Sequence, residues 1–109
     1  MSVLFPESDI LKILTNRKTA TCRNYPLQVG SRVSFMAGFK VFAVCEVTTV
    51  THIPDIRKID HDTVRKLGFK TRKSYLEQSY NTSNDSHERY MIEFVVVENR
   101  INEYIAKWL

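Results

Sequence analysis

A long run of apolar and β-branched residues, from Phe39 to Val50, sets the strongest limit on how this chain folds. Residues of these types favour strands over helices, and the segment from Tyr90 to Val97 has the same character. Apolar and polar residues alternate from Arg32 to Met36 and from Thr19 to Arg23, as in strands with one buried face. Strands and helices do not alternate regularly. We therefore expect an α+β domain built on a small curled sheet or barrel.

Short helical segments separate these strands. Ser8 suits the N-cap of a first helix, whose apolar stripe comprises Ile10, Leu11, Ile13 and Leu14. Asp60 can cap a second helix that Gly68 ends, and Thr71 can cap a third. The tail has three apolar residues spaced for one face of a closing helix: Ile101, Ile105 and Trp108. We expect most other aromatic side chains to pack in the core: Phe35, Phe39, Phe42, Tyr75, Tyr80 and Phe94.

Length and composition indicate one domain covering residues 1–109. Only three Gly and three Pro argue against disorder. No apolar run approaches the roughly 20 residues that span a bilayer, and the first residues lack the pattern of a secretion signal. We therefore expect a cytoplasmic protein with no membrane contact. Cys22 and Cys45 lie in strand-like runs, which favours free thiols, and the histidines show no metal-binding spacing, so we expect neither metal nor cofactor.

The positive charge is concentrated in one part of the chain. The net charge is only +4. Between Arg57 and Lys73, however, seven basic residues stand against Asp60 and Asp62. This cluster is typical of a face that meets phosphates, and it is equally typical of a solvated helix surface.

The segment from Asn16 to Arg23 holds three cations and two hydroxyls within eight residues. A purely structural strand would carry Val and Ile there instead. This density of hydrogen-bond donors suits an anionic ligand and indicates nucleic acid or a nucleoside, with or without cleavage. Tyr25, held extended before Pro26, either stacks on a base or covers the end of the barrel.

These residues together resemble the ASCH domain family, whose fold is a PUA-like β-barrel. The resemblance rests on a short helix that runs into the Arg17 to Arg23 motif, and on the strand entry from Val29 to Phe35. A helical insert containing Leu67-Gly68-Phe69 and a final strand beginning Tyr90-Met91-Ile92 complete it. The order of these elements covers the chain from about Ile10 to Val97. Ser31 replaces an acid that is common in the family.

The resemblance implies binding of RNA or a modified nucleoside in a cleft beside the barrel. In small bacterial members that hydrolyse N4-acetylcytidine, a Lys and a Thr of the first motif act with a Glu of the insert. Lys18 and Thr21 match the first two, but Leu67 occupies the position of the Glu. Asp60, Asp62 and Glu77 are candidate replacements. Lys18 and Thr21 are three residues apart, so their side chains converge only if Lys18 lies in the corner between helix and strand.

Two principal hypotheses follow. The first is an ASCH, PUA-like module that binds RNA, another nucleic acid or a modified nucleoside in a basic cleft, through Arg17, Lys18, Thr21, Arg23, Tyr25, Arg65, Lys66, Lys70, Arg72 and Lys73. The second is a small hydrolase, an N4-acetylcytidine amidohydrolase or a ribonuclease, with Lys18 and Thr21 as catalytic residues. A protein-interaction subunit is a third alternative.

Overall fold

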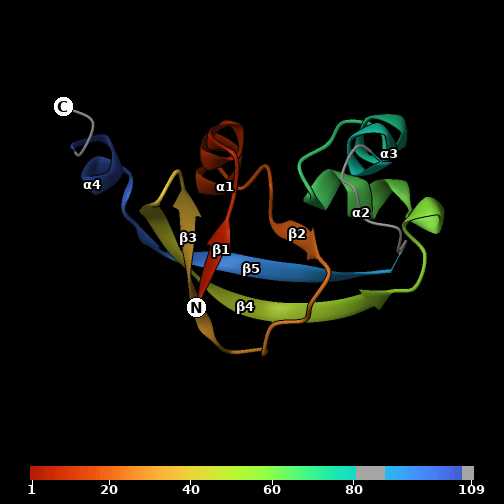
Figure 1. Ribbon diagram of the computed structural model, residues 1–109, viewed down its shortest axis with the longest axis horizontal. Coiled ribbons are helices and arrows are strands. Elements are labelled where there is room, and N and C mark those ends of the chain that lie inside the picture. The colour runs from red at the N-terminus through yellow and green to blue at the C-terminus, as the bar shows by residue number, and fades with distance from the viewer. Residues whose placement is uncertain (81–87, 107–109) are drawn as a thin grey trace.

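A curled five-stranded sheet forms the centre of the fold, as seen in the computed structural model, which describes residues 1–80 and 88–106 (Figure 1). The strand order is β1-β3-β4-β5-β2. β1 pairs parallel to β3, and the other neighbours are antiparallel. The strands are β1 (Ser2–Leu4), β2 (Ala20–Arg23), β3 (Arg32–Ala37), β4 (Lys40–Ile53) and β5 (Arg89–Asn99).

The long strand β4 bends the sheet. It pairs with β3 on one side and β5 on the other. Its register with β5 shifts between Val44 and Cys45 and again between Val47 and Thr49. Irregularities of this kind bend a strand and increase its twist. The sheet therefore curls into a half-barrel, which confirms the expected α+β class and PUA-like architecture.

Helices lie over the sheet at separate places along it (Figure 1). Near one end of the sheet, α1 follows a 3-10 turn, whereas α2 and α3 lie at the other end after a second such turn. None of the helices in the described residues is long and apolar enough to cross a membrane. The helical elements are η1 (Glu7–Asp9), α1 (Ile10–Leu14), η2 (Ile56–Lys58), α2 (His61–Lys66), α3 (Arg72–Tyr80) and α4 (Ile101–Ala106).

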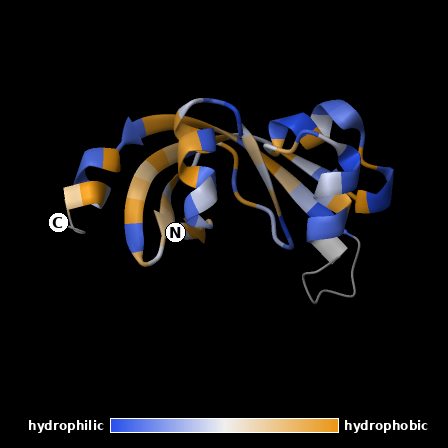
Figure 2. Cartoon of the chain, turned by 90° about the horizontal axis from the view of Figure 1, so that it is seen from above, coloured by the Kyte–Doolittle hydropathy of each residue, from blue (hydrophilic) through white to orange (hydrophobic). Residues whose placement is uncertain are grey.

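Two apolar clusters hold the structure together, and each includes residues of the sheet. Hydrophobic residues run along much of the sheet in Figure 2. In the first, the ring of Phe35 lies 4.6 Å from that of Phe5 and 4.7 Å from that of Phe94. Ile10 and Ile13 of α1 cover this cluster. The second packs α2 and α3 against β2 and β5 through seven buried residues: Ala20, Ile56, Ile59, Val64, Leu67, Tyr75 and Met91.

Most sequence-based expectations for the elements are confirmed. The Asp60 carboxylate accepts a hydrogen bond from the Thr63 amide at 2.7 Å and caps α2. The Thr71 hydroxyl accepts one from the Ser74 amide at 3.1 Å, at the start of α3. Cys22 and Cys45 are both free thiols.

Four local expectations were wrong or incomplete. Ser8 does not cap α1, because it lies inside η1. Leu11 is 63% exposed, so it does not belong to the buried stripe of α1. Phe39 is 93% exposed because it occupies the hairpin turn after Gly38 at a positive φ of 69°. Strand β1 was not anticipated. Trp108 and the side chain of Tyr80 lie outside the described residues.

The two edges of the curled sheet are joined by one side chain. Arg23, the last residue of the edge strand β2, donates a hydrogen bond of 2.8 Å to the carbonyl of Leu4 on the opposite edge strand β1. Its guanidinium also lies 4.9 Å from the centre of the Phe5 ring. Arg23 therefore links the two edges that backbone pairing leaves apart.

Gly68 allows the segment after α2 to approach Lys18. Its φ is +88°, and an added Cβ would lie 3.2 Å from the Lys18 Cβ. We expect Gly68→Ala to lower the free energy of unfolding by more than the roughly 1–2 kcal/mol that a left-handed conformation costs an L-residue. Gly38→Ala is the control, because Gly38 also has a positive φ but faces open space. Urea unfolding of both variants measures the difference in their free energies of unfolding. Equal losses of free energy in the two variants would show that Gly68 and Lys18 are not tightly packed.

Candidate functional site

Lys18 occupies the corner between α1 and β2. The carbonyl of Lys12 accepts hydrogen bonds from the amides of both Arg17, at 2.8 Å, and Lys18, at 2.9 Å. Asn16 adopts a positive φ of 60°, which turns the chain sharply after α1. This is the placement that the three-residue spacing to Thr21 requires, and both side chains line the same cavity.

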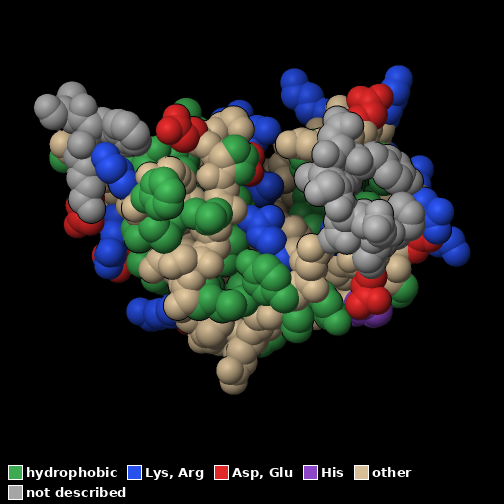
Figure 3. Space-filling model, in the orientation of Figure 1, with side chains coloured by type: hydrophobic (Ala, Val, Ile, Leu, Met, Phe, Trp, Pro, Cys, Tyr) green, Lys and Arg blue, Asp and Glu red, His purple; other side chains and the backbone are tan. Residues whose placement is uncertain are grey.

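This cavity, called here the Lys18 cavity, has a volume of about 360 Å³. Figure 3 shows Lys and Arg side chains in a hollow between the part of the molecule that carries α1 and the part that carries α2 and α3. Among the described residues that line the cavity, four carry a positive charge and one a negative charge: Lys12, Lys18, Arg23 and Arg89 against Asp9. Its other lining residues include Thr21, Cys22, Leu67, Phe69, Tyr75 and Gln78.

The ammonium of Lys18 is sheltered and has a carboxylate partner. Lys18 is only 8% exposed, and its Nζ lies 3.3 Å from Oδ2 of Asp9. Its Nζ also lies 5.8 Å and 6.0 Å from the ring centres of Phe5 and Phe69. Burial lowers the pKa of Lys18 because it disfavours the charged amine; Asp9 opposes this shift, and Arg23 adds to it. Burial and Asp9 therefore have opposite effects on the pKa of Lys18, and the effect of burial is the larger.

Asp9 is the carboxylate that sequence reasoning missed. Of the three candidate replacements, Asp60 caps α2 and Glu77 lies 4.0 Å from Lys73, and neither these two nor Asp62 lines the cavity. Asp9 precedes α1 and reaches Lys18 only because the chain turns back after that helix. No local sequence signal marks that contact.

The two arginines of the cavity donate hydrogen bonds to backbone carbonyls. Arg23 Nη1 donates to the carbonyl of Cys22 at 3.1 Å, and Arg89 Nη1 donates to that of Glu88 at 2.7 Å. Both side chains are largely withdrawn from solvent. Arg89 and Lys12 were not among the residues predicted from the sequence, because neither lies in a basic cluster. Burial raises the pKa of the Cys22 thiol, against the effect of its hydrogen bond with Tyr75.

The predicted basic residues outside the cavity separate into two groups. Arg17, Arg65 and Lys70 lie together in a neighbouring hollow. Lys66 instead pairs with Glu93 at 3.1 Å, and Lys73 with Glu77. Tyr25 is exposed and hydrogen-bonded to the Arg23 side chain, and it does not line the cavity.

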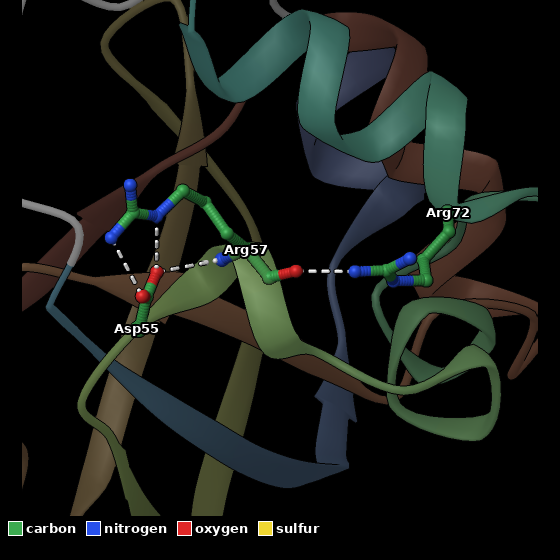
Figure 4. Close-up of polar contacts among 3 residues, drawn as sticks. All are labelled: Asp55, Arg57 and Arg72. Carbon is green, nitrogen blue, oxygen red and sulfur yellow. Dashed lines mark hydrogen bonds and ion pairs between the residues drawn. The ribbon is translucent and has the colours of Figure 1, made fainter.

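Arg72 contacts the protein backbone (Figure 4). From α3 it donates to the carbonyls of Ile59, at 2.7 Å, and of Arg57. Arg57 in turn pairs with Asp55 at 2.8 Å, and Asp55 caps η2. Arg72 therefore ties α3 to the turn before α2. That any of these residues binds nucleic acid stays a prediction.

Comparison with known proteins shows a similarity of structure. No family model and no curated protein sequence matches the chain. An ASCH domain from Lactobacillus crispatus superposes with a TM-score of 0.78 at 16% identity, over 90% of this chain and 79% of that one. An ASCH protein from Zymomonas mobilis gives 0.68 at 10% identity, over 97% and 76%. A protein from Enterococcus faecalis gives 0.71 at 17% identity, over 88% and 71%. The chain therefore has the ASCH domain fold, and the resemblance is confirmed at the level of the fold.

Among the described residues, no group of three His, Cys, Asp or Glu side chains is placed to hold a metal ion. The residues that line the cavity supply amine, hydroxyl, guanidinium, thiol and carboxylate groups.

The lowered pKa of Lys18 predicts the direction of a pH effect on stability. As the pH rises towards the ordinary value of 10.5, the folded state releases the Lys18 proton before the unfolded state does. The unfolded state then binds more protons, so stability rises with pH, by about 1.4 kcal/mol for each unit of pKa shift. We expect the free energy of unfolding of the wild type to increase relative to Lys18→Met between neutral and alkaline pH. A decrease in this free energy would mean that the ion pair with Asp9 affects the pKa of Lys18 more than burial does.

Proposed function

We propose that the protein binds nucleic-acid material in the Lys18 cavity, which receives one nucleotide of RNA or one modified nucleoside. The observation that carries the proposal is the excess of positive charge in a sheltered cavity, with Asp9 as the one acid among its described lining residues. Charges interact more strongly where water is partly excluded. Phosphate contacts supply most of the affinity of proteins for nucleic acids. The cavity therefore suits a ligand that carries a phosphate or sits beside one.

The uncharged lining suits a base. The rings of Phe69 and Tyr75 lie 5.2 Å apart, nearly perpendicular, and both line the cavity. An unstacked base can pack against such a ring, a contact worth about 1–3 kcal/mol in single-stranded complexes. The Thr21 hydroxyl and the Asp9 carboxylate provide acceptors for the base edge. The ASCH fold and the motif around Lys18 support the same assignment.

A single added charge tests the proposal. Gln78 is exposed at the cavity, and Gln78→Glu adds a carboxylate of almost the same shape. We expect it to weaken binding of nucleoside 5′-monophosphates by about fivefold, as one repulsive charge worth roughly 1 kcal/mol would, and to affect uncharged nucleosides less. Isothermal titration calorimetry measures both affinities.

Gln28→Glu is the matched control, because Gln28 is exposed and lies outside the cavity lining. If the two variants bind the monophosphates equally well, the anion does not enter the Lys18 cavity.

A second function, hydrolysis of a modified nucleoside, is favoured by the burial of Lys18 in the same cavity that Thr21 lines. Since burial lowers the pKa of Lys18, more of the amine is neutral than at an exposed lysine, and neutral amine is a base. It would take the proton of Thr21 as Oγ1 bonds to the acyl carbon of an amide. The same proton would pass to the nitrogen that leaves as the C–N bond breaks. Water would then hydrolyse the threonine ester and restore the hydroxyl.

Hydrolysis is tested with N4-acetylcytidine, following cytidine and acetate by chromatography. We expect Thr21→Val to abolish turnover. Asp9 raises the pKa of Lys18, so Asp9→Asn should move the rising limb of the pH–rate profile to lower pH. Asp62→Asn, on the exposed side of α2, should leave the profile unchanged. Absence of turnover in the wild type would remove this function and leave binding intact.

A further inference from the structure

The Lys18 cavity adjoins a second, larger hollow with a positively charged lining. This hollow, called here the outer groove, has a volume of about 700 Å³. Lys12 and Phe69 line both spaces, so the two hollows adjoin at these residues. The groove adds Arg17, Arg65 and Lys70, and no acidic residue lines it within the described part of the chain.

Most cations of the outer groove have no acidic partner within the described residues. Elsewhere, Lys66 pairs with Glu93 at 3.1 Å and Arg100 with Glu98 at 2.7 Å. Within the described residues, Lys12, Arg65 and Lys70 form no ion pair. Arg17 makes one weak local contact, from Nε to the Thr15 hydroxyl at 3.2 Å.

These cations converge from separate elements. Lys12 belongs to α1, Arg17 to the turn before β2, Arg65 to α2, and Lys70 to the segment between α2 and α3. A solvated helix face would place its charges along one helix. Here the fold gathers like charges around one hollow, where they repel one another unless an anion lies between them. A ligand with several negative charges fits this arrangement best.

We infer that the ligand of the Lys18 cavity is a single strand of nucleic acid whose neighbouring phosphates lie in the outer groove against Arg17, Arg65 and Lys70. The inference rests on the proposed function and narrows it, since a free nucleoside would leave the groove empty. Phe69, on the border, offers a ring on which the adjoining base stacks. A base must leave a duplex to enter the cavity, so the strand is single at this point.

The test compares ligands of increasing length. The probes are nucleoside 5′-monophosphates, randomised single-stranded RNA oligonucleotides from short to long, and an RNA duplex of the longest length. The groove variant combines Arg17→Gln, Arg65→Gln and Lys70→Gln. The control variant combines Lys66→Gln, Lys73→Gln and Arg100→Gln, which removes the same charge from residues that already have acidic partners.

Wild-type affinity should increase with length until the groove is filled. The groove variant should lose this increase and keep the affinity for monophosphates within about twofold. Its slope of log affinity against log salt should fall by about 0.7 for each cation removed, or roughly 2 in all. The control variant should keep the wild-type slope.

The outcomes separate the inference from the proposed function. If neither monophosphates nor RNA binds, the proposed function fails and the inference with it. Monophosphate binding that does not strengthen with length, or equal behaviour of groove and control variants, overturns the inference alone. Duplex bound as tightly as single strand also overturns it. Circular dichroism and thermal unfolding of both triple variants show that each is folded before the affinities are compared.

Discussion

The burial of Lys18 is the constraint around which the site is organised. Its amide is held by the carbonyl of Lys12 on α1, its side chain packs on Gly68 after α2, and its Nζ meets Asp9. An ammonium withdrawn from water is costly unless it has a partner. Asp9 supplies that partner, and the rings of Phe5 and Phe69 flank the charge at about 6 Å. The segment after α2 therefore meets η1 and α1, which are distant from it in the sequence, at one side chain.

The cavity lies beside the second apolar cluster, and Phe5 of the first cluster approaches it through Lys18. Phe5 belongs to the first cluster, whereas Leu67 and Tyr75 belong to the second. Between them, the Thr19 amide donates to the carbonyl of Lys66 at 2.8 Å, and its carbonyl accepts from the amide of Phe94 at 3.1 Å. This pair of bonds ties β2 to α2 and to β5. Because Leu67 and Tyr75 are packed in the second cluster, the wall of the cavity that they form rests on the apolar core.

What the sequence predicts well is what depends on neighbours along the chain. The caps at Asp60 and Thr71 are local hydrogen bonds, and the strand runs follow from residue type. The sequence could not reveal the contact between Asp9 and Lys18, because it depends on how the chain turns after α1. It also could not distinguish the basic residues from one another. Lys66 forms an ion pair with Glu93, which is 27 residues away in the sequence. Its neighbour Arg65 lies in the outer groove and has no acidic partner among the described residues.

The burial of Leu67 explains why the carboxylate that meets Lys18 comes from Asp9 and not from position 67. The side chain of Leu67 is 2% exposed and packs in the second cluster, where a carboxylate would replace apolar contacts. Asp9 instead approaches Lys18 from η1. An acid at that position favours the protonated amine, which binds anions, while burial favours the neutral amine, which accepts protons. Since burial has the larger effect on the pKa of Lys18, the amine is closer to acting as a base than an exposed lysine would be, although Asp9 opposes this. The two proposed functions thus call for different protonation states of one amine, and a phosphate beside Lys18 would shift its equilibrium towards the charged form.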